Sequence, residues 1–368
     1  MKFSRWVGIA LKAGAAAIIG AFFFLGPHAG DGNRVIGVAR AQSEPGAVAL
    51  IQSANAQYAE IWMRAFERGD LSDPVDGQQA VAVFNRSIPG VVASGAAIEL
   101  IDADVGFTEG PVGTPDGGLF FSAVMANRIY RLEPSGEVRV FLENSNGANG
   151  LVLQDSGTLL AVRNDGVIRI SRTGDVTSVV SETDRGTPFL RPNDLIADAR
   201  GGVYFTDPGP RPIVPGRNVY VYYKPPEASQ ILPIDDSIVR PNGIALSLDG
   251  NTLFANDSMG DTVYAYSVLA DGSVVDKRPF AALQNIPEGG VSGADGMVID
   301  QSDRLYVTTD TGVQIFDSEG QYLGTIAVPN RPTNVAFSGP GKSTLYITTF
   351  DGVYRLDTVT QGLARTGK

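Results

Sequence analysis

Six copies of one short β-rich phrase recur along the chain and constrain its fold more than any other feature. Each copy follows a glycine-rich or polar turn and runs through apolar and aromatic residues. The copies lie at 118–122, 157–161, 202–206, 251–255, 304–308 and 343–347. Most are followed about ten residues later by a second predicted strand. Units of roughly 40 to 50 residues with this content are typical of four-stranded propeller blades. The sequence therefore predicts an all-β, six-bladed β-propeller.

A propeller has to close its ring. We expect the strand around 97–101 to form the outer strand of the last blade, and the propeller to cover 91–360. A β-sandwich would also give short strands and regular turns, but it would not repeat one two-strand phrase six times.

The first 41 residues resemble an export signal. Basic residues precede an apolar run at 13–25, and Ala39 and Ala41 are the small residues of a cleavage site. Because that site lies far from the apolar run, an uncleaved membrane anchor is the alternative. Either one predicts a periplasmic or secreted domain, or a domain anchored to the inner membrane.

The segment 42–90 differs in pattern from the propeller. Apolar residues recur at three- and four-residue spacing between 46 and 68, which predicts an accessory helix followed by a linker.

Composition removes several kinds of active site. The chain has no cysteine, and its one histidine, His28, lies in the export segment. Thiolate metal sites, a cysteine nucleophile and a Ser-His-Asp triad each lack a required part. The net charge of −11 argues against nucleic acid as a partner.

A second repeat of polar residues precedes most of the β-rich phrases. The positions are Glu109, Asn149, Asn193, Asn242, Asp295 and, in the phrase 332–334, the carboxamide of Asn334. Each single Asn-Gly or Asp-Gly pair could be an ordinary turn, but six polar positions in phase favour a site. Equivalent points on innermost strands converge on a propeller axis, and hard oxygen ligands select calcium, or less often magnesium or manganese.

Four phrases carry a resemblance to a known family. They are FTEGP at 107–111, RPNDL at 191–195, PNGIA at 241–245 and DGM at 295–297. Their order and spacing are similar to those of the gluconolactonase, senescence-marker-protein and luciferin-regenerating enzyme family, over about 98–357.

The resemblance implies a six-bladed propeller with a catalytic divalent cation. It implies that Glu109, Asn242 and Asp295 are metal ligands, and that Asn193 is a fourth ligand or a substrate contact. Arg191 matches an arginine that binds substrate oxygen in some members, and Asp295 would be the catalytic proton-transfer residue.

Two further side chains are candidates for substrate binding, namely Asn149 on the ring and Asp257 at a strand end. Many bacterial members carry a Glu-His pair near the second blade. This chain has the sequence AVRND at 161–165 instead, which leaves its native substrate open.

The leading hypothesis is a calcium-dependent lactonase that acts on a small lactone or ester, with Mg²⁺, Mn²⁺ or Zn²⁺ as the other metals considered. One alternative is a non-enzymatic propeller that binds a ligand or a protein and holds a structural calcium. A phosphotriesterase-like hydrolase that uses the same metal is another.

Overall fold

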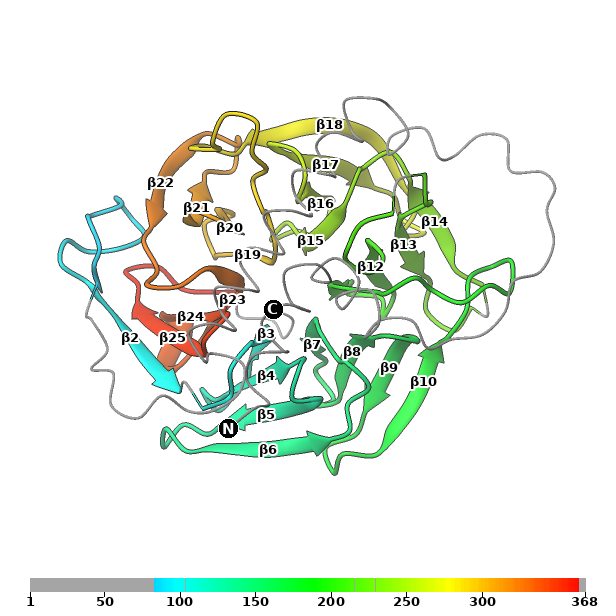
Figure 1. Cartoon of the computed structure of the whole chain (residues 1–368), viewed down its shortest axis with the longest axis horizontal. Coiled ribbons are helices and arrows are strands. Elements are labelled where there is room, and N and C mark those ends of the chain that lie inside the picture. The colour runs from blue at the N-terminus through cyan, green and yellow to red at the C-terminus, as the bar shows by residue number, and fades with distance from the viewer. Residues whose placement is uncertain (1–82, 103, 215, 229, 364–368) are drawn as a thin grey trace, which may run out of the picture.

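Six β-sheets surround a central axis in a computed structural model, which describes residues 83–102, 104–214, 216–228 and 230–363 (Figure 1). Five sheets have four antiparallel strands in chain order, and the sixth has five. The predicted six-bladed propeller is confirmed. The expected export segment and the helix at 46–68 lie outside the described residues. None of the described helices is long and apolar enough to span a membrane.

The first three blades follow one another along the chain. Blade 1 contains β3 (Glu109–Gly113), β4 (Leu119–Ala123), β5 (Arg128–Leu132) and β6 (Val138–Glu143). Blade 2 contains β7 (Leu151–Leu153), β8 (Leu159–Arg163), β9 (Gly166–Ile170) and β10 (Val176–Val180). Blade 3 contains β11 (Leu195–Ala197), β12 (Val203–Asp207), β13 (Tyr220–Lys224) and β14 (Leu232–Asp235).

Blades 4 and 5 repeat this order. Blade 4 contains β15 (Pro241–Leu246), β16 (Thr252–Asp257), β17 (Thr262–Val268) and β18 (Val274–Ala282). Blade 5 contains β19 (Met297–Ile299), β20 (Leu305–Thr309), β21 (Gly312–Phe316) and β22 (Tyr322–Ile326).

Blade 6 joins the two ends of the propeller in one sheet. It contains β23 (Pro332–Ser338), β24 (Thr344–Thr349) and β25 (Val353–Asp357), with the short 3₁₀-helix η1 (Pro340–Lys342) between β23 and β24. The strand β2 (Ala97–Asp102) pairs with β25, and β1 (Val83–Phe84) pairs with β2. The predicted closure by a strand around 97–101 is confirmed.

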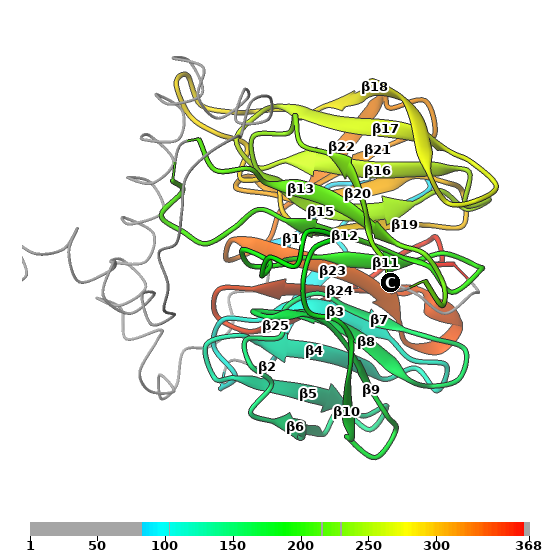
Figure 2. The same ribbon diagram turned by 90° about the vertical axis from the view of Figure 1, so that its right-hand side faces the viewer.

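Buried apolar residues of neighbouring blades form shared clusters, and the blades stack side by side around the ring (Figure 2). Every residue of β4, β12 and β20 is buried, because both faces of these second strands pack against adjacent sheets. The outermost strands β6 and β10 are mostly exposed or half-buried. This decrease in burial from the second strand to the outermost strand explains why the second strands begin with apolar and aromatic runs and are the most recognisable part of the repeat.

Candidate active site

The polar residues of the second repeat come together at the start of the innermost strands. Glu109 is the first residue of β3, and Asn242 is the second residue of β15. Asn149, Asn193 and Asp295 lie two residues before β7, β11 and β19. These strands surround the centre of the ring (Figure 1). Five successive blades therefore contribute one side chain each to one end of the axis, and we call these five residues the axial ring.

Blade 6 contributes Thr333 at the corresponding position. Its backbone carbonyl accepts a hydrogen bond from Gly296 (2.8 Å), as the carbonyl of Asn193 does from Gly150 (2.9 Å). The Oδ1 atom of the next residue, Asn334, accepts from the neighbouring backbone N–H instead (2.9 Å). Within the described part of blade 6, a hydroxyl thus stands where the other blades have a carboxylate or an amide.

The glycines after the ring residues are sites of close approach between blades. A Cβ atom at Gly110 would lie 2.0 Å from the carbonyl oxygen of Asn149, and one at Gly243 would lie 2.0 Å from that of Asp295. Gly243 lies inside a strand. The Asn-Gly pair therefore does not form a turn here, and its glycine leaves room for the next ring residue.

Side-chain donors on the second strands form hydrogen bonds to the backbone carbonyls of the ring residues. In each case a buried hydroxyl or amide group of one blade donates to the backbone carbonyl of the next blade's ring residue. The bonds run from Ser122 Oγ to Asn149 (2.8 Å), Thr206 Oγ1 to Asn242 (2.7 Å), Asn256 Nδ2 to Asp295 (2.6 Å) and Thr308 Oγ1 to Thr333 (2.9 Å). The backbone of these ring residues is therefore positioned by the preceding blade.

Three oxygen atoms of the axial ring are buried without a hydrogen-bond donor in the described residues. They are Oδ1 of Asn149, Asn242 and Asp295. The Nδ2 atom of Asn242 donates to Ser258 Oγ (3.0 Å), which fixes the amide so that Oδ1 faces away from Ser258. An unsatisfied buried oxygen costs roughly 1–3 kcal/mol, and a bound cation would remove that cost.

Glu109 adds a further buried carboxylate to this set. The residue is 2% exposed, and its Oε2 accepts a hydrogen bond from the backbone N–H of Gly110 (3.2 Å). Two carboxylates with amide oxygens fit a calcium-type cation. Three or more His, Cys, Asp or Glu side chains do not gather as metal ligands anywhere in the described ranges, so any cation here would depend on amide oxygens.

Asp295 has a strongly perturbed carboxylate. Burial raises the pKa of Asp295 to about 7, and the positive charges of Arg331 and Arg211 oppose that rise. The Nη1 atom of Arg331 lies 4.0 Å from Asp295 Oδ2. A cation at the ring would favour the charged carboxylate further, since an adjacent positive charge lowers the pKa of an acid.

Two buried aspartates hold the loops that lead into the ring. Asp207, at the end of β12, accepts hydrogen bonds from the backbone N–H groups of 190–191 (2.8 and 2.7 Å). Asp257, at the end of β16, accepts the equivalent bonds from 239–240 (3.3 and 3.0 Å). Burial raises the pKa of Asp207 to about 6. Arg191 is thus placed by Asp207, while a contact between Asp257 and a substrate stays a prediction.

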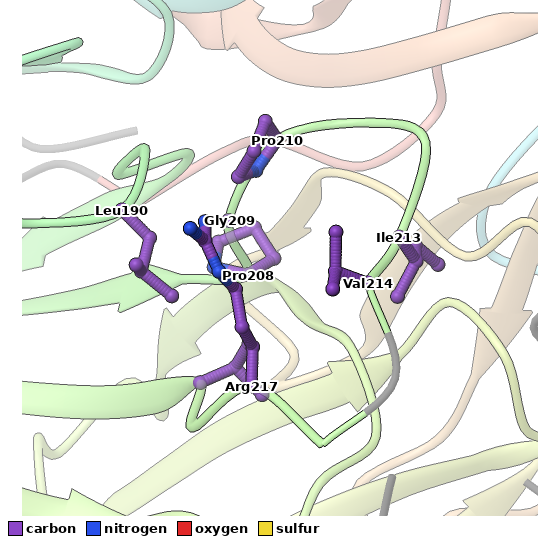
Figure 3. Close-up of a pocket in the computed structure, with 8 residues that line it drawn as sticks. Leu190, Pro208, Gly209, Pro210, Ile213, Val214 and Arg217 are labelled. Atoms are coloured by element: carbon purple, nitrogen blue, oxygen red, sulfur yellow. The ribbon is translucent and has the colours of Figure 1, made fainter. Parts of the chain in front are cut away.

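The connection between β12 and β13 packs over the ring end of blades 3 to 5. Its Ile213 belongs to an apolar cluster with Met259 and Val291, which follow β16 and precede β19. Arg240 Nη1 donates to the carbonyl of Pro208 (3.1 Å). Figure 3 shows Leu190 and several residues of this connection around a recess of about 10 Å³. That volume holds about one water molecule, so the connection is packed closely against its neighbours.

The sequence pattern predicted that the five ring residues converge on the axis, but it did not identify several of the residues that contact them. Arg331 was not singled out, although the Arg-Pro pair at 331–332 repeats those at 191–192 and 240–241. The donors Thr206 and Thr308 occupy the fifth position of the β-rich phrase, where a hydroxyl recurs. The repeated Arg-Pro pair and the recurring hydroxyl were the sequence signals that could have identified these partners.

Comparisons with known proteins agree with this architecture. The profile of the SMP-30/Gluconolactonase/LRE-like region matches residues 107–351. A gluconolactonase from Zymomonas mobilis is 28% identical over 313 residues, covering 77% of this chain and 87% of its own. The structure of a gluconolactonase from Xanthomonas campestris superposes with a TM-score of 0.67 at 25% identity, covering 78% of this chain and 97% of its own.

A calcium-binding protein, regucalcin, from Agrobacterium tumefaciens has the same fold. It superposes with a TM-score of 0.62 at 20% identity, covering 72% of this chain and 94% of its own. Because the profile match spans most of the propeller and the axial ring lies inside it, this chain belongs to the SMP-30/gluconolactonase/LRE-like family.

Proposed function

We propose that this protein is a divalent-metal-dependent lactonase whose cation, most simply Ca²⁺, is held by the axial ring. The observation that carries the proposal is the set of three buried oxygens, on Asn149, Asn242 and Asp295, that have no donor among the residues that the structure describes. The carboxylate of Glu109 and the half-buried amide of Asn193 complete the candidate ligands. The lactonase activity of the Zymomonas relative supports the reaction class.

A divalent cation supplies a Lewis acid that polarises a lactone carbonyl. Asp295 accepts the proton of the attacking water, which suits a carboxylate whose pKa is raised by burial. Arg191, placed by Asp207, and Asn193 bind oxygen atoms of the substrate. Small lactones and related esters are the proposed substrates.

The test combines metal analysis of the purified protein with turnover assays on lactones, an aryl ester and a phosphotriester. We expect lactone hydrolysis that a chelator abolishes and Ca²⁺ restores. Turnover of the phosphotriester alone would replace the lactonase by a phosphotriesterase. A bound cation without any turnover would point to a ligand-binding propeller with a structural metal.

The variant Asp295→Asn tests the catalytic assignment. It keeps the shape of the side chain and removes the proton acceptor, so kcat should fall by roughly 10²–10⁴-fold. Asp271→Asn, at an exposed position, is the control that should leave turnover unchanged. Wild-type turnover in Asp295→Asn would remove this residue from the mechanism.

We further propose that the propeller acts outside the cytoplasm, in the periplasm or the medium. The basic and apolar pattern of residues 1–41 supports this proposal. Fractionation of the native host, with N-terminal sequencing of the extracted protein, tests it and distinguishes a cleaved signal from an anchor. Recovery of the protein only from the cytoplasm would contradict it.

A further inference from the structure

Arg331 is held at the axial ring by three contacts from different elements. Its Nε pairs with the carboxylate of Asp310, and its Nη2 donates to the backbone carbonyl of Gly293 (3.1 Å). The guanidinium carbon lies 5.1 Å from the centre of the Phe350 ring. A planar guanidinium fixed along one edge and one face has little rotational freedom. The direction in which Nη1 points is therefore fixed by these contacts.

A third nitrogen of the group, Nη1, lies near the proposed proton acceptor. The distance of 4.0 Å between Nη1 and Asp295 Oδ2 is too long for a direct hydrogen bond. It is the right length for one oxygen atom placed about 2.8 Å from each group. That oxygen would accept from Nη1 and donate to Oδ2, so it has to carry a proton. A hydroxyl group or a water molecule fits these conditions, whereas a carbonyl oxygen does not.

We propose that Arg331 is a catalytic residue that positions the attacking water by donating a hydrogen bond to its oxygen. This inference rests on the proposed lactonase function. In the step, the water oxygen bonds to the lactone carbonyl carbon while one of its protons passes to Asp295 Oδ2. The bond between the acyl carbon and the ring oxygen then breaks, and the ring oxygen takes the proton back from Asp295. One lactone and one water give one hydroxy acid.

The water is preferred over a substrate hydroxyl because of what surrounds Arg331. The side chain of Arg331 is only 17% exposed, and that of Asp295 is 11% exposed. A separation of 4.0 Å between two nearly covered groups suits a single water better than a hydroxyl attached to a sugar ring. A water seated there also has the proton acceptor in place, which is the geometry that general-base catalysis requires.

The experiment compares Arg331→Gln and Arg331→Lys with wild type on two lactones, one polyhydroxylated and one without hydroxyl groups. Arg128→Gln is the matched control, because Arg128 also pairs with a carboxylate, Glu143 (2.8 Å), but on the outer strands of blade 1. We expect Arg331→Gln to lower kcat about 100-fold on both lactones with KM little changed, as for a misplaced reactant. Added guanidinium ion should restore part of the turnover of Arg331→Ala.

Each other result has a definite meaning. If Arg331→Gln has the kcat of an active wild type, this inference is overturned while the proposed lactonase function stands. A loss confined to the polyhydroxylated lactone and seen in KM would also overturn it, because the oxygen would then belong to the substrate. Weaker Ca²⁺ binding by Arg331→Gln in calorimetry would overturn it by showing an effect through the ligands. If wild type hydrolyses neither lactone, the proposed function has failed and this inference fails with it. If Arg331→Gln does not fold, Arg331→Lys and the guanidinium rescue decide.

Discussion

Replacing Thr206 by valine should loosen the ring without creating a steric clash. Thr206 is fully buried, its Oγ1 donates to the Asn242 carbonyl (2.7 Å), and it accepts from the backbone N–H of Asp194 (3.2 Å). Valine removes both bonds, and each buried group left without a partner costs roughly 1–3 kcal/mol. Part of that loss is offset if the Asp194 N–H moves to the freed carbonyl. We expect the free energy of unfolding to fall by about 2 kcal/mol.

Thr206→Ser is the control, because it keeps the hydroxyl and loses one methyl group, at a cost of about 1 kcal/mol. Urea unfolding measures both changes, and calorimetric titration with Ca²⁺ measures the effect on the ring. Because Asn242 is a proposed ligand, Ca²⁺ should bind more weakly to the valine variant than to the serine variant. The reasoning is refuted if valine is no more destabilising than serine and Ca²⁺ affinity is unchanged.

Two further predictions concern the same end of the propeller. Gly243→Ala should reduce lactone turnover by about 100-fold, because its Cβ would lie 2.0 Å from the Asp295 carbonyl oxygen. Gly260→Ala is the control and should remain active, because the atom nearest to its Cβ would be 3.4 Å away. Equal activities of the two variants would show that the strands shift at no cost. Since burial raises the pKa of Asp207 from 3.8 to about 6, the folded protein binds more protons than the unfolded one between these values, so this residue makes stability fall as pH rises from about 4 to 6. Urea unfolding across that range should show a shallower fall in Asp207→Asn, and an unchanged slope would contradict the assignment.

Much of the fold could be predicted because each blade of a propeller repeats a similar sequence pattern. The second strands are buried on both faces, so strands such as β12 (203–207) and β20 (305–309) begin with apolar and aromatic residues that are easily recognised. The outermost strands could not be delimited in the same way. β18 runs for nine residues with mostly exposed side chains, and such a strand has no strong hydrophobic pattern.

The candidate site could be predicted only as a set of positions. Phase in the repeat is enough to bring Asn149, Asn242 and Asp295 to one place, since each blade has the same geometry. Arg331 could not be connected to Asp295 in this way, because its placement depends on Asp310 and Phe350, which lie just after β20 and β24. Thr333 shows the limit of the pattern, because the following asparagine looked like the ring residue of blade 6 until the register was known.

The sheet of blade 6 has a consequence for the order of folding. Its strands β2 and β25 lie at opposite ends of the propeller sequence, and Glu99 and Arg355 form an ion pair across them (2.8 Å) although 256 residues separate them. During synthesis from the N-terminus, β2 can pair with β1, but its other edge has no partner until β25 of the last blade has been made. The growing chain therefore exposes unpaired strand edges for most of its synthesis, and contacts this distant in sequence form slowly. Closure of the ring therefore has to wait until the last blade has been synthesised.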